Sequence, residues 1–355
     1  MRTAIYATLC SVFLFSLIRC GSGDDEDETS GNHALKLDLQ NYDPHVGQMV
    51  RARVLNRTLK TVVKDDEMLL TTANQSFSWP QLLQNGHDYY LDFYADLNGN
   101  GACDSPETDH AWRLKINQAS ADVTIDDKHN MNFSDICKSF TDDAFPQATG
   151  TSVTLRGNLA LSNDVTDVDG LTAGQKLQGA TVFVEGFPEQ EARSNEQGQF
   201  ELVFNVNAVA LAEGSYQLVM WYTQKSTDAS SSWGDIEARV GARKEITLPE
   251  GSGGQLDVET VELTYTKLAT LKLQDKDSGA ALSVCRISVP AYDFQLFVDE
   301  FEAGSYRIDY LPKGNYTAVI HCAGYVDKSV SLSIEGATKK GDTQDLGGIE
   351  MEKSS

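Results

Sequence analysis

Residues His87–Glu107 read HDYYLDFYADLNGNGACDSPE. In the first half, Tyr89, Leu91 and Phe93 fall on one side of an extended chain and the intervening side chains fall on the other. This two-residue period is the pattern of a β-strand. The second half is rich in Asp, Asn and Gly, the composition of a tight polar turn. The stretch therefore predicts a strand that ends in a polar loop, and similar runs elsewhere predict an all-β protein.

The polar loop has the residue types and the spacing of a calcium site. Calcium takes six to eight oxygen ligands, and a twelve-residue loop can supply most of them from positions 1, 3, 5, 7, 9 and 12, with glycine at position 6. Those six ligand positions hold Asp96, Asn98, Asn100, Ala102, Asp104 and Glu107, and position 6 holds Gly101. The loop resembles the calcium loop of EF-hand proteins, carried here on a strand instead of helices. The resemblance implies a bound Ca²⁺; the alternative is a metal-free hairpin turn, for which Asn-Gly-Asn-Gly is well suited.

Composition limits the partners of the chain. It has 355 residues, enough for two or three domains, and 41% of them are hydrophobic, which is adequate for packed cores. Its formal net charge of −23 argues against nucleic acid as a binding partner, because proteins bind the phosphate backbone through a basic surface.

The N-terminus predicts export. Arg2 precedes the uncharged and mostly apolar run Ala4–Ile18, which is short for a membrane span. Cys20 follows, and then an acidic tether up to residue 32. This arrangement resembles a bacterial lipoprotein processing site, although Arg19 stands where such sites have a small residue. The resemblance implies cleavage after residue 19, lipid on Cys20 and anchoring at the outer membrane or cell surface; the alternatives are ordinary signal cleavage or an uncleaved anchor.

The cysteine count supports an oxidising compartment. Cys10 would leave with the signal and Cys20 would carry lipid, which leaves an even set of four: Cys103, Cys137, Cys285 and Cys322. Four cysteines allow three pairings. We favour Cys103–Cys137 with Cys285–Cys322, because each bridge then stays within one domain.

The remaining chain divides into three predicted units. They span residues 33–137, 150–249 and 256–351, with linkers at 138–149 and 250–255. In the first unit we expect strands at Ala34–Leu39, Gln48–Leu55, Met68–Thr72, His87–Ala95 and Ala111–Ile116, and a helical turn at Ser78–Gln84.

Two motifs relate the second and third units to a known family. The second unit contains Gly179-Ala180-Thr181-Val182-Phe183-Val184, and the third contains Leu311-Pro312-Lys313-Gly314-Asn315-Tyr316 followed by Gly324-Tyr325. These segments resemble carboxypeptidase regulatory-like domains. The resemblance implies tandem Ig-like or transthyretin-like β-sandwiches, and it carries no catalytic residue.

The sequence contains none of the common catalytic motifs, such as His-Glu-x-x-His, Gly-x-Ser-x-Gly or a Walker loop. The six histidines are scattered along the chain, and we interpret His110, beside the acidic loop, as structural instead of a zinc ligand. The acidic runs at 65–67 and 126–127 are expected to be solvated.

We therefore predict a non-catalytic, calcium-stabilised surface lipoprotein for adhesion or scaffolding, with a glycan or protein ligand and Trp233 as an exposed contact. The alternatives are a spacer without a ligand and a secreted hydrolase.

Overall fold

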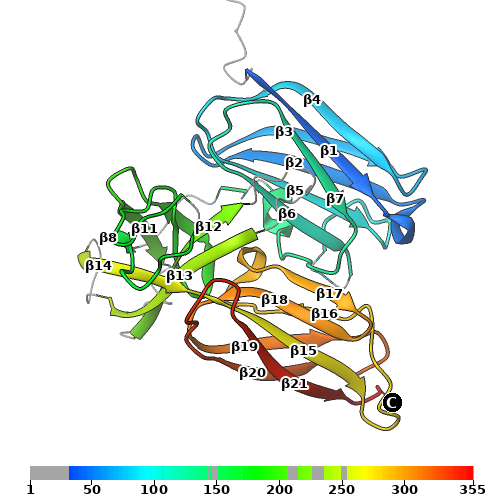
Figure 1. The fold of residues 1–355 in the computed structure, drawn as a ribbon. Helices are drawn as coiled ribbons and strands as arrows, with labels where there is room; N and C mark the ends of the chain where they lie inside the picture. Colours follow the sequence, from blue (N-terminus) through cyan, green and yellow to red (C-terminus); the bar gives the residue numbers. More distant parts are fainter. Residues whose placement is uncertain are drawn as a thin grey trace, which may run out of the picture.

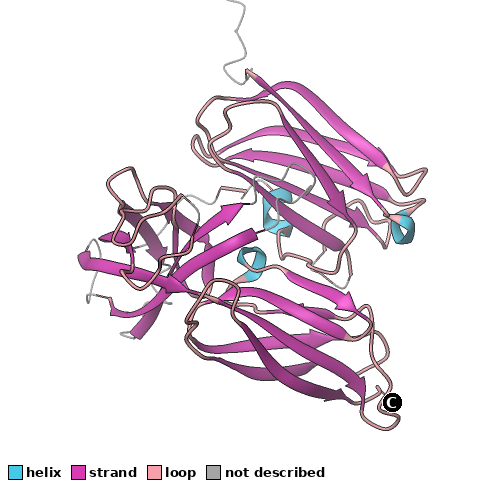
Figure 2. Ribbon diagram, in the orientation of Figure 1, coloured by secondary structure: helices cyan, strands magenta, loops and turns pink. Residues whose placement is uncertain are grey.

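The computed structural model describes residues 32–104, 106, 108–141, 144–145, 151–168, 170–206, 215–225, 236–248 and 254–354. These residues form an all-β protein, as predicted, whose strands group into three domains with only short 3₁₀ turns between the strands (Figures 1 and 2). None of the helices within these ranges is long and apolar enough to span a membrane. The expected signal, the tether, Cys20 and Trp233 lie outside the described residues.

The first domain is a sandwich of two sheets around one core (blue to teal in Figure 1). One sheet has the order β4-β1-β7 and the other has the order β3-β2-β5-β6. Its strands and 3₁₀ turns are β1 (His33–Gln40), η1 (Asp43–His45), β2 (Met49–Asn56), β3 (Thr61–Leu69), β4 (Gln75–Leu83), β5 (Tyr89–Asp96), β6 (His110–Ile116), β7 (Val123–Lys128) and η2 (Cys137–Phe140).

The helical turn expected at Ser78–Gln84 is wrong, because this segment belongs to strand β4. Phe77 and Trp79 alternate into the core and pair with Leu37 and Leu35 of β1. The presence of Pro80 argued against a strand here, because proline is rarely found inside a sheet. Here β4 is an edge strand, where a residue without an N–H is tolerated.

The acidic pair at 126–127 is not simply solvated surface. Asp127 lies on β7, is fully buried, and accepts a hydrogen bond from the hydroxyl of buried Tyr42. Burial raises the pKa of Asp127 to about 7, although the hydrogen bond from Tyr42 acts to lower this pKa. The strand expected at Met68–Thr72 lies earlier in the chain, because β3 runs from Thr61 to Leu69.

The second domain is one seven-stranded sheet in the order β10-β9-β12-β13-β14-β8-β11, folded over its own core. Its strands are β8 (Thr151–Leu161), β9 (Thr181–Val184), β10 (Phe187–Arg193), β11 (Gln199–Val206), β12 (Ser215–Lys225), β13 (Ile236–Thr247) and β14 (Gln255–Tyr265). We expected β14 to open the third unit. Instead it pairs in parallel with β8 and contributes Val258, Val261 and Leu263 to the second core, so the third domain begins with β15.

The third domain is a sandwich of sheets β17-β18-β15-β21 and β16-β19-β20 (yellow to red in Figure 1). Its elements are β15 (Lys267–Asp275), β16 (Arg286–Ser288), η3 (Asp293–Gln295), β17 (Val298–Glu302), β18 (Ser305–Leu311), β19 (Gly314–His321), β20 (Lys328–Ile334) and β21 (Thr343–Met351). A disulfide joins Cys285 to Cys322 inside this domain, and another joins Cys103 to Cys137 inside the first, which is the favoured pairing.

The second and third domains share apolar contacts through the two faces of one sheet. On β12, Leu218 and Met220 point into the second core, while Val219 and Trp221 point into the third. On β9, Phe183 likewise packs into the third core. Because both faces are covered, all four residues of β9 are buried, and Val182-Phe183-Val184 form an uninterrupted apolar run instead of an alternating one.

A buried carboxylate joins all three domains. Glu191 on β10 is 1% exposed and forms ion pairs with Arg57 (2.7 Å) and Lys115 (2.8 Å) of the first domain. Gln295 of the third domain donates to the same carboxylate and accepts from Lys115 Nζ (2.7 Å). Burial alone would raise the pKa of Glu191, but the Lys115 and Arg57 cations outweigh it and hold this pKa at about 2.

We predict that Glu191→Gln destabilises the protein by about 3–5 kcal/mol, because it leaves two partly buried cations without their counter-charge. The wild type should also show an acid sensitivity that the variant lacks. Since the folded pKa of about 2 lies below the ordinary 4.5, the ionised carboxylate stabilises the fold above pH 4.5, and this contribution disappears as the pH falls from 4.5 towards 2. Urea unfolding as a function of pH measures both effects.

The control is Glu201→Gln, which removes the exposed ion pair of Glu201 with Arg156. That change should cost less than about 1 kcal/mol. An equal loss of unfolding free energy in the two variants would contradict a structural role for the contacts of Glu191 with Arg57, Lys115 and Gln295.

Candidate functional site

The acidic loop connects β5 to β6 at one end of the first domain. The two strands pair in antiparallel register up to Ala95 and His110, so the chain leaves and re-enters the sheet at neighbouring points. Strand β5 is buried along its whole length, which fixes the position of Asp96 at its end. The sequence prediction of a strand followed by a polar loop is confirmed.

Asp96 organises the first half of the loop. Its Oδ1 accepts hydrogen bonds from the backbone N–H groups of Gly99 (2.7 Å) and Asn100 (3.2 Å), and its Oδ2 accepts one from Gly101 (2.8 Å). Gly99 and Gly101 have φ angles of +70° and +75°, a conformation that side chains with a Cβ disfavour. The two glycines therefore let the backbone wrap around the carboxylate.

The amide side chains cross the loop to Asp104. Asn98 Nδ2 and Asn100 Nδ2 donate to Asp104 Oδ2 at 2.7 and 2.8 Å. The amide oxygens accept from the backbone, Asn98 Oδ1 from Asn100 and Asn100 Oδ1 from Ala102. Five of the six residues expected to hold calcium thus lie in one hydrogen-bonded loop; the sixth, Glu107, lies outside the described residues.

Asp109 is a loop residue that the sequence analysis did not identify. It is fully buried, and its two oxygens accept the backbone N–H groups of Leu97 (2.9 Å) and Asp104 (3.0 Å). Burial raises its pKa, the two N–H groups oppose the shift, and the charges of Asp96 and Asp104 add to it. The charges of two loop carboxylates therefore act on the buried Asp109 at the base of the loop. Its place one residue before β6 was visible in the sequence, but its burial was not.

The second half of the loop is tied to the domain by a disulfide. Cys103 is bonded to Cys137 at the start of η2. The expected linker begins in this turn: Phe140 packs edge-on against Tyr94 with ring centroids 4.8 Å apart.

Three histidines that the sequence analysis treated as scattered meet near the loop. His45 ends η1, His110 opens β6 and His129 follows β7. His45 is buried and the other two are half-buried. Burial lowers the pKa of all three, to about 4 for His110 and His129, so the imidazoles are neutral at pH 7. No sequence pattern signals this cluster, because its members are far apart in the chain.

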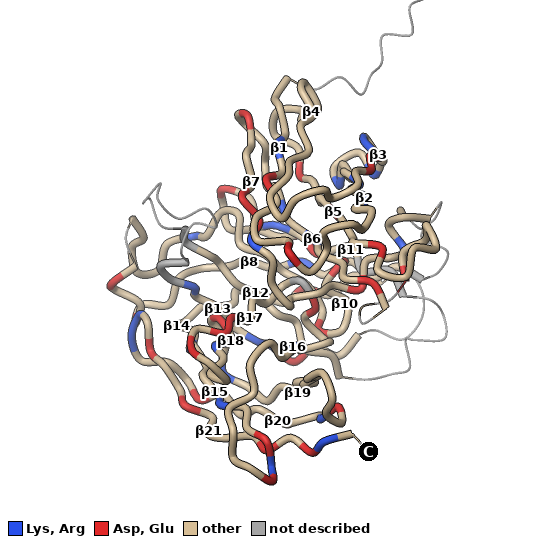
Figure 3. Tube along the Cα trace, turned by 90° about the vertical axis from the view of Figure 1, so that its right-hand side faces the viewer, with Lys and Arg blue, Asp and Glu red and all other residues tan. Residues whose placement is uncertain are grey.

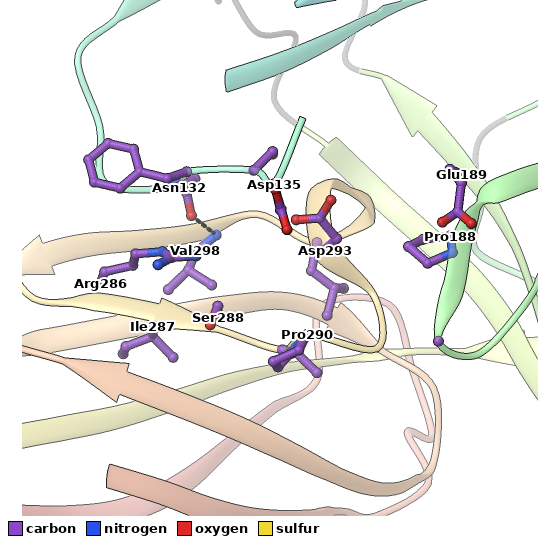
Figure 4. Close-up of a pocket in the computed structure, with 15 residues that line it drawn as sticks. Asn132, Asp135, Pro188, Glu189, Arg286, Ile287, Ser288, Pro290, Asp293 and Val298 are labelled. Carbon is purple, nitrogen blue, oxygen red and sulfur yellow. Dashed lines mark hydrogen bonds between the residues drawn. The ribbon is translucent and has the colours of Figure 1, made fainter. Parts of the chain in front are cut away.

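A cavity of about 300 Å³ lies where the three domains meet (Figure 4). Its wall includes Asp135 of the first domain, Glu189 of the second and Arg286 of the third. Across it, Asn132 Oδ1 accepts a hydrogen bond from the backbone N–H of Val298 (2.9 Å), which links the first and third domains directly. The wall mixes such charged groups with apolar side chains, among them Phe133, Ile287 and Leu296. Acidic residues occur along the chain in all three domains, in keeping with the negative net charge (Figure 3).

No family model and no curated protein matches the sequence. Among solved structures, the chain is 13% identical to the Bacillus anthracis TIE protein, with a TM-score of 0.18 over 91% of this chain and 51% of that one. It is 14% identical to the shaft pilin SpaA from Lactobacillus rhamnosus GG, with a TM-score of 0.20 over 58% and 99% of the two chains. It is 10% identical to BcpA, the major pilin subunit of Bacillus cereus, with a TM-score of 0.19 over 91% and 99%. The chain spans about half the length of the TIE protein. Likeness of this size says nothing about activity or partners.

We predict that Asp109→Asn destabilises the first domain by about 1–3 kcal/mol, because one of the two backbone donors would face an amide N–H₂ group in place of an oxygen. Thermal unfolding followed by circular dichroism measures the loss. Asp345→Asn serves as the control, since Asp345 accepts a single N–H, from Gly347, at an exposed position of β21. A melting temperature unchanged by Asp109→Asn would contradict the role given to this carboxylate.

Proposed function

We propose that this chain is a non-catalytic, exported surface protein that acts as a rigid structural or adhesive module. The observation that carries the proposal is the Glu191 joint, in which one buried carboxylate binds side chains of the first and third domains. A string of domains on flexible linkers would not need such a joint. A module that transmits force or presents a binding face at a fixed angle needs its domains held in one relative arrangement.

The disulfides support a place outside the cytoplasm. Each of the two bridges closes a separation of 34 or 37 residues within one domain. Loops of this size contribute roughly 3–4 kcal/mol, and such bridges persist in oxidising compartments. The predicted signal, and the tether after Cys20, fit the same location, with lipid on Cys20 as the anchor. A relationship of the second and third domains to carboxypeptidase regulatory-like domains is part of the proposal and implies no peptidase activity.

We further propose that the acidic loop binds Ca²⁺. The charges of Asp96 and Asp104 act on the buried carboxylate of Asp109 at its base, and a divalent cation would offset this repulsion. Rotating the amides of Asn98 and Asn100 would turn their oxygens towards Asp104 and the ion. Asp96 already has the hydrogen bonds that hold a carboxylate at the start of such a loop. The Ala102 carbonyl and Glu107 would complete the set.

Calcium should raise the melting temperature of the exported chain by a few degrees. An extracellular-type affinity of about 0.1–1 mM and 10 mM CaCl₂ give about 1.4–2.7 kcal/mol of stabilisation. Differential scanning calorimetry with and without a chelator measures the shift. Asp104→Asn should remove the response, while Asp345→Asn should keep it. A melt indifferent to chelator would leave the loop as a simple polar turn.

Mass spectrometry of the native protein from membranes tests export and anchoring. We expect an acylated N-terminus at Cys20 and no free thiols at the other four cysteines of the mature chain. In a Cys20→Ser variant the protein should leave the membrane fraction while keeping both disulfides. Recovery of the full-length chain from cytosol, with its signal uncleaved and its thiols reduced, would overturn the proposed location.

An adhesive role calls for a ligand, and a glycan or another surface protein suits an exported module without a basic surface. Binding to immobilised glycans and cell-wall fractions, measured with calcium and with chelator, separates an adhesin from a spacer. Binding that the Asp104→Asn variant loses would favour adhesion through the loop end of the first domain. No binding under either condition would favour a spacer.

A further inference from the structure

Three imidazoles from distant parts of the first domain converge on one point. His45 Nε2 lies 3.1 Å from His129 Nε2 and 3.3 Å from His110 Nδ1. The three nitrogen atoms all lie within 4.8 Å of one another. Within the described part of the chain, this is the one group of His, Cys, Asp or Glu side chains that meets the geometry of a metal site.

The separations match the dimensions of a zinc centre. Zinc–nitrogen bonds of about 2.0–2.1 Å at tetrahedral angles place two ligand nitrogens about 3.3–3.4 Å apart. The spacings of 3.1 and 3.3 Å from His45 Nε2 to the other two nitrogens match this value. The third spacing, between His110 and His129, lies within 4.8 Å, so one ion would bind all three rings once these two side chains move closer together.

Hydrogen bonding alone does not account for the cluster. His45 Nδ1 lies 2.8 Å from Gln48 Oε1, an acceptor, so Nδ1 carries the proton and Nε2 carries the lone pair. That single lone pair faces two ring nitrogens, and it can accept an N–H from only one of them. A cation would instead use the lone pairs of all three nitrogens at once.

The surroundings hold the rings in place. The Gln48 side chain orients His45, as the outer partners of zinc-bound histidines do. Trp112 stands edge-on to His45 and His110, with ring centroids 5.6 and 6.2 Å away, and Phe133 stacks on His110 at 3.9 Å. Preorganised ligands lose little conformational entropy when a metal binds.

We propose that His45 Nε2, His110 Nδ1 and His129 Nε2 form a Zn²⁺ site with an open fourth position. His45 is buried behind the ion, while the half-buried His110 and His129 leave the outer side accessible to water or to a fourth ligand. The site is separate from the proposed calcium loop in chemistry, since imidazole selects zinc and oxygen ligands select calcium. It does not depend on the proposed surface function.

The test is a titration of the untagged, metal-free exported chain with Zn²⁺ by isothermal titration calorimetry, in the presence of millimolar Ca²⁺. We expect one equivalent to bind. Gln48→Ala should weaken the affinity by about 10–100-fold through loss of the ring-orienting hydrogen bond. His129→Gln removes a half-buried ligand and should weaken binding at least as much. X-ray absorption at the zinc edge should show nitrogen neighbours at about 2.0–2.1 Å.

His321→Gln, in the third domain, is the matched control and should leave the affinity unchanged. Circular dichroism of each variant shows whether the fold survives; Gln48→Ala keeps all three rings and remains informative if His129→Gln does not fold. Absence of stoichiometric Zn²⁺ binding to the wild type would overturn the proposal. So would equal affinity in the wild type, Gln48→Ala and a folded His129→Gln variant.

Discussion

A single carboxylate, that of Glu191 in the second domain, binds side chains of the first and third domains at a place where its own side chain is buried. An isolated charge in such a place would be strongly destabilising. Arg57 and Lys115 remove that cost from one side and Gln295 satisfies the remaining hydrogen-bonding capacity from the other. Because each partner comes from a different part of the chain, the carboxylate is satisfied only when the domains adopt one relative arrangement. The geometry of the whole molecule is therefore specified by polar groups as well as by apolar packing.

The apolar counterpart of this joint is the sheet face that carries Phe183, Val219 and Trp221. These residues belong in sequence to the second domain and in space to the core of the third. Tyr292 of the third domain packs against Phe183 and Trp221 with ring centroids 5.7 and 6.0 Å apart. A sheet with both faces buried cannot slide or rotate without exposing one of them. The second and third domains therefore form one packed unit and are not independent domains joined by a linker.

The functional features differ in how far the sequence revealed them. The acidic loop was predictable because its oxygen-bearing residues lie within twelve positions of one another, so local spacing alone placed them together. The sequence did not predict the role of Asp109, because that role depends on burial against the turn that it closes. It did not predict the histidine cluster for a stronger reason. His110 and His129 lie 65 and 84 residues after His45, and only the packing of η1 and the loop after β7 against β6 brings the three together. The fold errors have similar origins: Pro80 is tolerated at a sheet edge, and Asp127 is buried and bonded to Tyr42, which follows the neighbouring strand β1.

The sequence by itself determined the all-β class, the strand before the acidic loop and a favoured pairing of the four cysteines. These depend on two-residue periodicity, local turn chemistry and the proximity of each cysteine pair in the chain. Only the tertiary structure decided that β14 belongs to the second domain, that Glu191 joins three domains and that three distant imidazoles share one site. Each of these depends on contacts between residues far apart in the chain, and side-chain period along one strand carries no information about which other strand will cover it.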